Sequence, residues 1–86
     1  MEIFIDCAAI ASREALHHTF ASALSFPAWY GKNLDALYDC LSGICACIHL
    51  QHWEQAEAAL GNYGKNARRV LCQAAENSEK LEVFFE

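Results

Sequence analysis

Residues 26–41 read FPAWYGKNLDALYDCL, and this stretch decides how the chain is organised. Pro27 ends any helix that precedes it, because its ring removes a backbone donor and clashes with the preceding turn. Asn33 is a preferred N-cap residue, since its side chain can accept a hydrogen bond from a backbone N–H of the next turn. An apolar stripe at helical spacing follows, made of Leu34, Leu37 and Leu41. The stretch therefore predicts a turn over residues 26–32 and then an amphipathic helix.

Outward from this stretch, the same periodicities predict the rest of the chain. Ser12 is a candidate N-cap for an earlier helix, and Gly43 stands where a helix end favours a positive φ. The predicted elements, in chain order, are a strand at 2–6, helices at 13–25 and 34–42, a strand at 44–50, helices at 53–60 and 65–77, and a strand at 81–85. Strands separated by helices predict a parallel sheet. We therefore expect one α/β domain over residues 1–86, with a three-stranded parallel sheet packed by about four helices in the order β-α-α-β-α-α-β.

The composition excludes several classes of protein. The chain has 86 residues, 55% of them hydrophobic, with a single proline, which is typical of a small globular domain and not of a disordered one. Its apolar runs are far shorter than the ~20 residues that cross a bilayer, and its first residues lack the features of a secretion signal. A net charge of −5 opposes contact with a phosphate backbone and suits a basic partner. We therefore expect a cytoplasmic protein that neither associates with a membrane nor contacts nucleic acid directly.

The second predicted helix carries two aspartates: Asp35, in the first turn, is favoured by the helix dipole, whereas Asp39, one turn further on, gains little from it. At 100° per residue Asp39 lies about 40° from Asp35, away from the leucine stripe. Carboxylates one turn apart repel, and the nearest base, Lys32, lies outside the helix. Three aromatic residues are close in sequence: Trp29, Tyr30 and Tyr38. This favours an interface for a cationic partner over an idle acidic face. A catalytic or metal-binding carboxylate pair is the weakest interpretation, because one exposed helix does not give two carboxylates different pKa values, so no enzyme and no catalytic residue is expected.

The cysteines and histidines raise the possibility of a metal site. The five cysteines, an odd number with apolar neighbours, are Cys7, Cys40, Cys45, Cys47 and Cys72. Without an export signal they predict free thiols packed as small hydrophobes. Cys45, Cys47, His49 and His52 have metal-ligand residue types, but residues two apart in a strand are ~6.6–7 Å apart, too wide for a tight zinc site. We therefore expect no metal and no cofactor, with zinc at this cluster as the alternative.

Two histidines, one tryptophan and a cluster of basic residues are expected to have structural rather than functional roles. His17 and His18 point in different directions on one helix, so both are expected on or near the surface. Trp53, at a strand–helix junction, is expected in the core. The only basic cluster is expected to be a solvated helix end and consists of Lys65, Arg68 and Arg69.

The pattern Pro-x-x-Tyr-Gly-x-Asn-Leu-Asp-Ala-Leu-x-Asp-x-Leu over residues 27–41 resembles that of the barstar family, small intracellular inhibitors of ribonucleases. The match is long and ungapped, and a looser similarity spans nearly the whole chain. The resemblance implies a barstar-like fold, which agrees with the element order predicted above. It also implies a bacterial immunity or antitoxin protein whose second helix and preceding loop plug the active site of a basic, barnase-type ribonuclease, a secreted enzyme or a toxin. Such a protein would be a monomer when free and would form a 1:1 complex.

The resemblance also implies roles for single residues. Asp39 would be the central anchor, its carboxylate standing in for the RNA phosphate among the nuclease's arginines and histidine. Asp35 would pair with groups at the base-recognition end, and Trp29 would pack on the catalytic histidine. The complete set of expected partner-binding residues is Trp29, Tyr30, Asn33, Leu34, Asp35, Tyr38, Asp39, Gly43 and Glu76. Departures from the family's best-known member occur at Trp29, Lys32, Tyr38 and Ile44. They leave an alternative open, a barstar-like module that binds a different basic toxin or a regulatory partner.

Overall fold

The computed structural model describes residues 2–86 and confirms the predicted order of elements. These elements are β1 (Glu2–Asp6), α1 (Arg13–Leu24), α2 (Leu34–Ser42), β2 (Ala46–Gln51), α3 (Trp53–Leu60), α4 (Asn62–Glu76) and β3 (Leu81–Phe85). The strands form one sheet in the order β1-β2-β3, and both neighbouring pairs are parallel. Each crossover between parallel strands consists of two helices, as the predicted β-α-α-β-α-α-β order requires.

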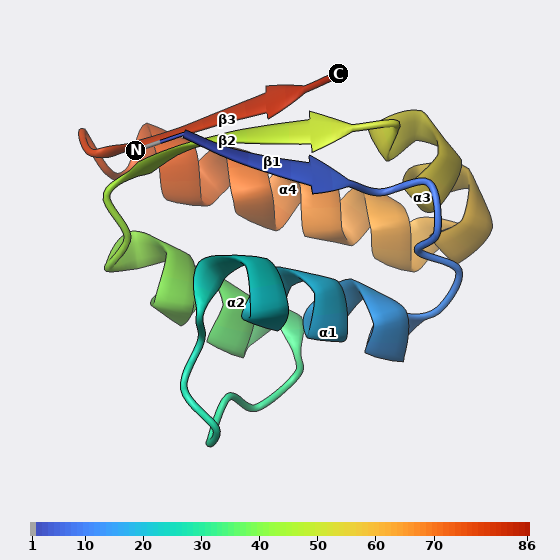
Figure 1. The fold of residues 1–86 in the computed structure, drawn as a ribbon, viewed down its shortest axis with the longest axis horizontal. Coiled ribbons are helices and arrows are strands. Elements are labelled where there is room, and N and C mark those ends of the chain that lie inside the picture. Colours follow the sequence, from blue (N-terminus) through green and yellow to red (C-terminus); the bar gives the residue numbers. More distant parts are fainter. Residues whose placement is uncertain (1) are drawn as a thin grey trace.

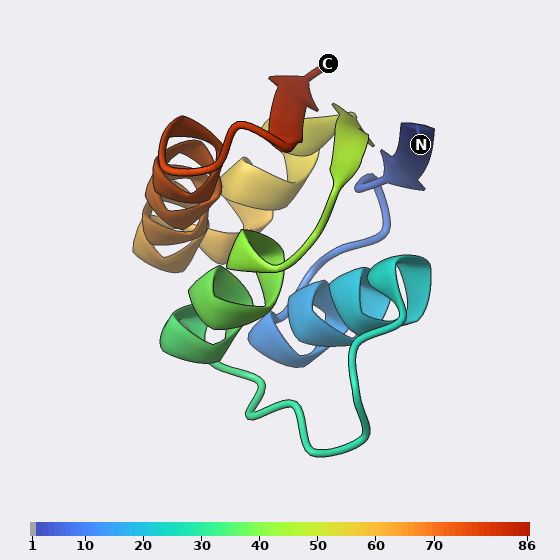
Figure 2. The same cartoon turned by 90° about the vertical axis from the view of Figure 1, so that its left-hand side faces the viewer.

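The four helices lie on one side of the sheet, and the other face of the sheet is open to solvent (Figure 1, Figure 2). Side chains alternate along β2, where Ile48 and Leu50 are fully buried beneath the sheet. Cys47 and His49 point to the open face and are only half-buried. This alternation confirms the predicted strand, because neighbouring residues in a strand face opposite sides.

Helices α1 and α2 begin directly after the N-cap residues that the sequence predicted. Ser12 precedes α1, and its Oγ accepts a hydrogen bond from the backbone N–H of Ala15 at 3.1 Å. Asn33 precedes α2, and its Oδ1 accepts from the N–H of Ala36 at 2.8 Å. Ser25 ends α1 in the left-handed conformation, with φ of 57°. The turn that leads to α2 therefore starts and stops at residues that satisfy the backbone groups of the two helix ends.

The inner face of the sheet and the apolar stripes of the helices form one core. Its fully buried members include Leu16 and Phe20 of α1, Leu37 and Leu41 of α2, Ile48 and Leu50 of β2, and Leu71 of α4. Trp53 is only 2% exposed, which confirms its predicted core position. Burying one such leucine contributes about 1.5–3 kcal/mol, so α2 is held firmly by its inner face. Among residues 2–86, no helix has the length and apolar character needed to cross a membrane.

The structure corrects the predicted helix ends. Gly43 has φ of −99°, so the prediction of a positive φ is wrong; its N–H closes a tight turn on the carbonyl of Cys40. Helix α4 begins at Asn62, earlier than the predicted start at Lys65. The reason is Gly61, which adopts φ of 63° and ψ of −130° and reverses the chain in a single residue.

The cysteines only partly fulfil the prediction that they pack in the core. All five are free thiols, and Cys7 is completely buried. Cys45 is exposed, because β2 begins at Ala46, two residues later than predicted. The prediction is therefore wrong for Cys45, whose thiol lies in the connection before the strand.

Candidate protein-binding site

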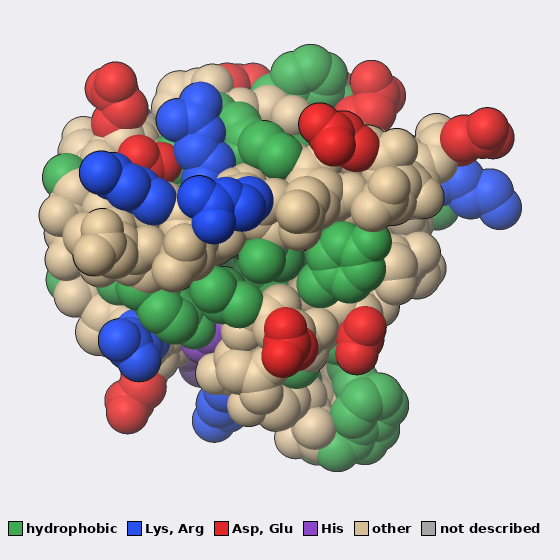
Figure 3. All heavy atoms as spheres, turned by 180° about the vertical axis from the view of Figure 1, so that it is seen from behind, with side chains coloured by type: hydrophobic (Ala, Val, Ile, Leu, Met, Phe, Trp, Pro, Cys, Tyr) green, Lys and Arg blue, Asp and Glu red, His purple; other side chains and the backbone are tan. Residues whose placement is uncertain are grey.

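The outer face of α2 carries Asp35 and Asp39, which we call the acidic face. Both side chains are exposed, whereas Leu37 and Leu41 on the inner side have no exposed surface. In the part of the chain that the structure describes, neither carboxylate forms an ion pair with a basic side chain. The helix dipole favours Asp35 in the first turn, but Asp39 lies one turn further on, and the two like charges repel. Figure 3 shows acidic side chains standing over α2 with hydrophobic surface around them.

The loop before α2 is fixed to the helix by its own hydrogen bonds. The N–H of Tyr30 donates to the carbonyl of Pro27 at 3.0 Å and closes a turn. The side chain of Asn33 both caps α2 and donates to the carbonyl of Gly31 at 3.3 Å. The loop and the first turn of α2 therefore form one continuous, hydrogen-bonded unit.

A buried histidine ties this loop to the body of the protein. His17 of α1 bonds through Nδ1 to the hydroxyl of Tyr30 and through Nε2 to the hydroxyl of Tyr63 in α4, both at 2.6 Å. A neutral imidazole has one N–H and one acceptor nitrogen, so it can satisfy both hydroxyls at once. Burial lowers the pKa of His17 and raises the pKa of Tyr30 and Tyr63, which keeps all three groups uncharged.

This network overturns two expectations. The prediction that His17 lies at the surface is wrong, because its side chain is only 1% exposed. Tyr30 was expected among the surface aromatics, but it is 6% exposed and supports the loop from beneath. The one available signal was that His17 lies one residue after Leu16 and three before Phe20, at the edge of the buried stripe of α1.

A hollow of about 410 Å³ opens between the loop and α2. Its lining is mainly apolar and includes Phe26, Pro27 and Ile44, and Asp39 is the one charged residue in it. Trp29 stands at the hollow with 81% of its surface exposed, more than any other large hydrophobic residue that the structure describes. Large exposed apolar side chains beside a concave surface are typical of binding sites.

The other predicted site residues lie on or near the same side. Leu34 is half-buried in the first turn of α2, and Gly43 is exposed and lines the hollow. The hydroxyl of Tyr38 accepts a hydrogen bond at 2.8 Å from the Nδ2 group of Asn77, just after α4. Glu76, the exposed last residue of α4, is therefore next to a residue that contacts α2.

The basic side chains of α4 gather over another part of the surface (Figure 3). Lys65, Arg68 and Arg69 are all exposed, as predicted for a solvated helix end. Arg68 also lies 3.8 Å from the carboxylate of Glu57 and packs over the ring of Phe85 at 5.0 Å. These bases do not neutralise the acidic face, which stays available for cations from another molecule.

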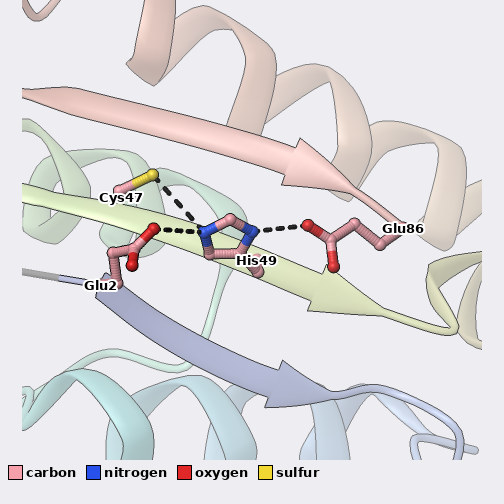
Figure 4. Close-up of polar contacts among 4 residues, drawn as sticks. All are labelled: Glu2, Cys47, His49 and Glu86. Atoms are coloured by element: carbon pink, nitrogen blue, oxygen red, sulfur yellow. Dashed lines mark hydrogen bonds and ion pairs between the residues drawn. The ribbon is translucent and has the colours of Figure 1, made fainter.

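The alternative zinc cluster is only partly assembled. Cys45 is exposed outside β2, and His52 pairs with Asp6 at 3.1 Å. Cys47 and His49 do lie together, with Glu2 of β1 as a third neighbour rather than the predicted residues. Figure 4 shows this arrangement on the open face of the sheet, on the side of the molecule away from the loop before α2.

The fold and this surface define a class of protein: a small α/β protein with a three-stranded parallel sheet and an unneutralised acidic helix beside an aromatic loop. The family model described as "Barstar (barnase inhibitor)" matches residues 1–86. A relative from Bacillus subtilis (strain 168), named "Putative ribonuclease inhibitor YrdF", is 36% identical over 89 residues, which cover 99% of this chain and 98% of the relative. The chain belongs to the barstar family.

Proposed function

We propose that this protein inhibits a barnase-type ribonuclease by covering its active site with α2 and the loop before it, without catalysis of its own. The observation that carries the proposal is the acidic face: Asp35 and Asp39 are exposed and have no basic partner among residues 2–86. Membership of the barstar family and the name of the Bacillus subtilis relative support a ribonuclease as the class of target.

The charge of the acidic face suits the surface that a ribonuclease must present. Such an enzyme holds the phosphates of RNA with cationic side chains, and a carboxylate can accept the same charge-assisted hydrogen bonds. Asp39 lines the hollow and Asp35 lies one turn earlier, so the pair can meet two groups of cations about 6 Å apart. The net charge of −5 has the same sign as RNA, and it speeds encounter with a basic enzyme.

The shape of the site suits a protein partner. Trp29 offers a large, rigid apolar surface, and the hollow beside it has room for a side chain of the nuclease. The buried Leu37 and Leu41 and the Asn33 cap hold α2 in place before binding. Little conformational freedom is then lost on association, which favours high affinity. In this proposal Tyr30 supports the loop, and Glu76 adds a more distant ion pair at the rim of a 1:1 complex.

The test is RNA cleavage by a panel of basic, barnase-type ribonucleases, titrated with the native protein and with Asp39→Asn. The native protein should inhibit at one equivalent. Asp39→Asn should weaken inhibition by about 10²–10⁴-fold, because removing one partner of a buried ion pair costs about 3–5 kcal/mol. The matched control is Glu54→Gln, which removes the same charge from an exposed residue of α3 and should change inhibition by less than about two-fold.

Two results would contradict the proposal. Inhibition of no nuclease in the panel would refute the barnase-type target, and a pull-down with the native protein and Asp39→Asn would then search for a different basic partner. An equal loss for Glu54→Gln and Asp39→Asn would show that net charge acts, rather than the acidic face. Urea unfolding of both variants is the control for folding, because removing repulsion on α2 should leave stability unchanged or slightly raised.

A further inference from the structure

The open face of the sheet holds a histidine between two aromatic rings. The parallel register places Phe4, His49 and Phe84 opposite one another on β1, β2 and β3. The imidazole is stacked on Phe4 with centroids 4.5 Å apart and on Phe84 at 5.2 Å, with interplanar angles of 13° and 19°. Stacking on both sides fixes the plane of the ring, so both nitrogens have defined directions.

Each nitrogen of His49 has acidic or sulfur neighbours (Figure 4). Nδ1 lies 2.5 Å from the carboxylate of Glu86, just after β3. Nε2 lies 3.1 Å from Oε2 of Glu2 and 3.6 Å from Sγ of Cys47. Glu2 and Cys47 meet because the register pairs them across β1 and β2. The cluster thus offers oxygen, nitrogen and sulfur ligand atoms from two strands, with a further carboxylate behind the imidazole.

Two of the three distances among these ligand atoms match a tetrahedral zinc site, and the third, between sulfur and oxygen, is at most 4.8 Å. With Zn–S of about 2.3 Å and Zn–N and Zn–O of about 2.0–2.1 Å, tetrahedral geometry requires S···N of about 3.6 Å and N···O of about 3.3 Å. The observed distances are 3.6 Å and 3.1 Å, and all three ligand atoms lie within 4.8 Å of one another. The spacing of Cα atoms along one strand suggested a site that is too wide; the Cys47 and His49 side chains converge, and the third ligand comes from β1.

We propose that Glu2, Cys47 and His49 bind Zn²⁺, with water in the fourth position. A hydrogen bond from Nδ1–H of His49 to Glu86 would orient the ring, as carboxylates commonly do for zinc-bound histidines. The thiol and imidazole donors favour Zn²⁺ over Mg²⁺ and Ca²⁺, which prefer oxygen. On binding, the Cys47 thiol and Nε2 of His49 release their protons to the solvent, and the metal forms bonds to sulfur and nitrogen.

The surroundings of the ligand atoms are acidic. The carboxylates of Glu2 and Glu86 flank the imidazole of His49, and the strand register places Glu82 opposite Cys47. Negative charge around the three ligand atoms favours a bound cation. The site goes beyond the proposed ribonuclease inhibition, because it lies on the open face of the sheet and shares no residue with the acidic face.

The test is calorimetric titration of untagged, reduced protein with Zn²⁺ alone, together with absorption spectra of the Co²⁺ complex. We expect one Zn²⁺ per chain and a thiolate-to-Co²⁺ charge-transfer band. Cys47→Ser and His49→Gln should each weaken binding at least ten-fold and abolish or displace that band. Glu86→Gln should weaken binding by about 10–100-fold without removing a ligand.

Matched controls come from the residues that the cluster leaves out. Cys45→Ser and His52→Gln change the same residue types nearby, and they should keep the native affinity within about two-fold. The proposal is overturned if the native protein shows no saturable Zn²⁺ binding at micromolar concentrations, or if the Co²⁺ complex has no thiolate band. Loss of binding in the two control variants, with retention in Cys47→Ser, would also overturn it. None of these results depends on ribonuclease inhibition.

Discussion

Replacing His17 with phenylalanine should destabilise the protein strongly, because it puts an apolar ring in place of a buried imidazole that bonds two hydroxyls. The substitution removes both hydrogen bonds of the imidazole and leaves the hydroxyl of Tyr30, a residue only 6% exposed, without its partner. An unsatisfied buried hydroxyl costs about 1–3 kcal/mol. Tyr63 is only half-buried and can turn to water, so its lost hydrogen bond adds about 0.5–1.5 kcal/mol. The sum is about 2–4 kcal/mol, a large share of the ~4–13 kcal/mol expected for a chain of this length.

The measurement is urea unfolding at pH 7.5, followed by circular dichroism and tryptophan fluorescence. His18→Phe is the matched control, because His18 is the exposed neighbour on the same helix and its replacement should change stability by less than about 0.5 kcal/mol. The triple variant His17→Phe/Tyr30→Phe/Tyr63→Phe should be more stable than His17→Phe alone, since it leaves no polar group unsatisfied.

Two outcomes would refute this reasoning. If His17→Phe and His18→Phe unfolded at the same urea concentration as the native protein, the network would contribute nothing to stability. If the triple variant were less stable than His17→Phe, volume and packing would explain the loss better than the orphaned hydroxyl of Tyr30. In that case the loop before α2 would be held mainly by its own turn and by the Asn33 cap.

Two further predictions concern pH and backbone packing. Because burial lowers the pKa of His17, its contribution to stability is fully present above about pH 6.5 and is lost as pH falls. The pKa of His49 is raised, so its contribution is fully present below about pH 6.5 and is lost as pH rises. Between pH 7.5 and pH 5 the urea midpoint should therefore fall more steeply in His49→Gln than in the native protein. An equal fall in both proteins would contradict a raised pKa of His49 in the folded state. Gly64→Ala should lower the free energy of unfolding by about 1–3 kcal/mol, because its Cβ would lie 2.8 Å from backbone atoms of Glu57. In the control Gly43→Ala the nearest atom is 3.9 Å away, so stability in the same assay should be unchanged or slightly higher.

The fold was predictable because its signals are local. Ser12 and Asn33 mark helix starts by a hydrogen bond that reaches only three residues along the chain. The alternation of β2 appears in consecutive residues, and the helices between the strands predict parallel pairing. Gly43 shows the limit of such signals, since glycine at a helix end permits a positive φ and the chain instead turned with a negative one.

The errors at His17 and Tyr30 arose because each side chain has a partner far away in the sequence. His17 can be buried because Tyr63, 46 residues later, supplies a hydroxyl for its second nitrogen. The sequence of α1 alone cannot predict this contact. His49 likewise meets Glu2 at a separation of 47 residues, through the register of two strands. Polar residues of this kind look like surface residues in the sequence, because what satisfies them is visible only after the elements have packed.

The acidic face was predicted for the opposite reason: among residues 2–86 neither aspartate has a basic partner. Leu37 and Leu41 have no exposed surface and account for how α2 packs. On the other side Asp35 and Asp39 repel each other, and only Asp35, in the first turn, is favoured by the helix dipole. The buried face of α2 holds the helix in the fold and the exposed face does not, so replacing Asp35 or Asp39 should leave the protein folded. Tyr30 lies in the same stretch, residues 26–41, as these aspartates but has an internal partner, so in the proposed function it acts through the position of the loop. Among residues 2–86, an internal partner thus separates Tyr30, which positions the loop, from Asp35 and Asp39, which the proposed function assigns to contact with a nuclease.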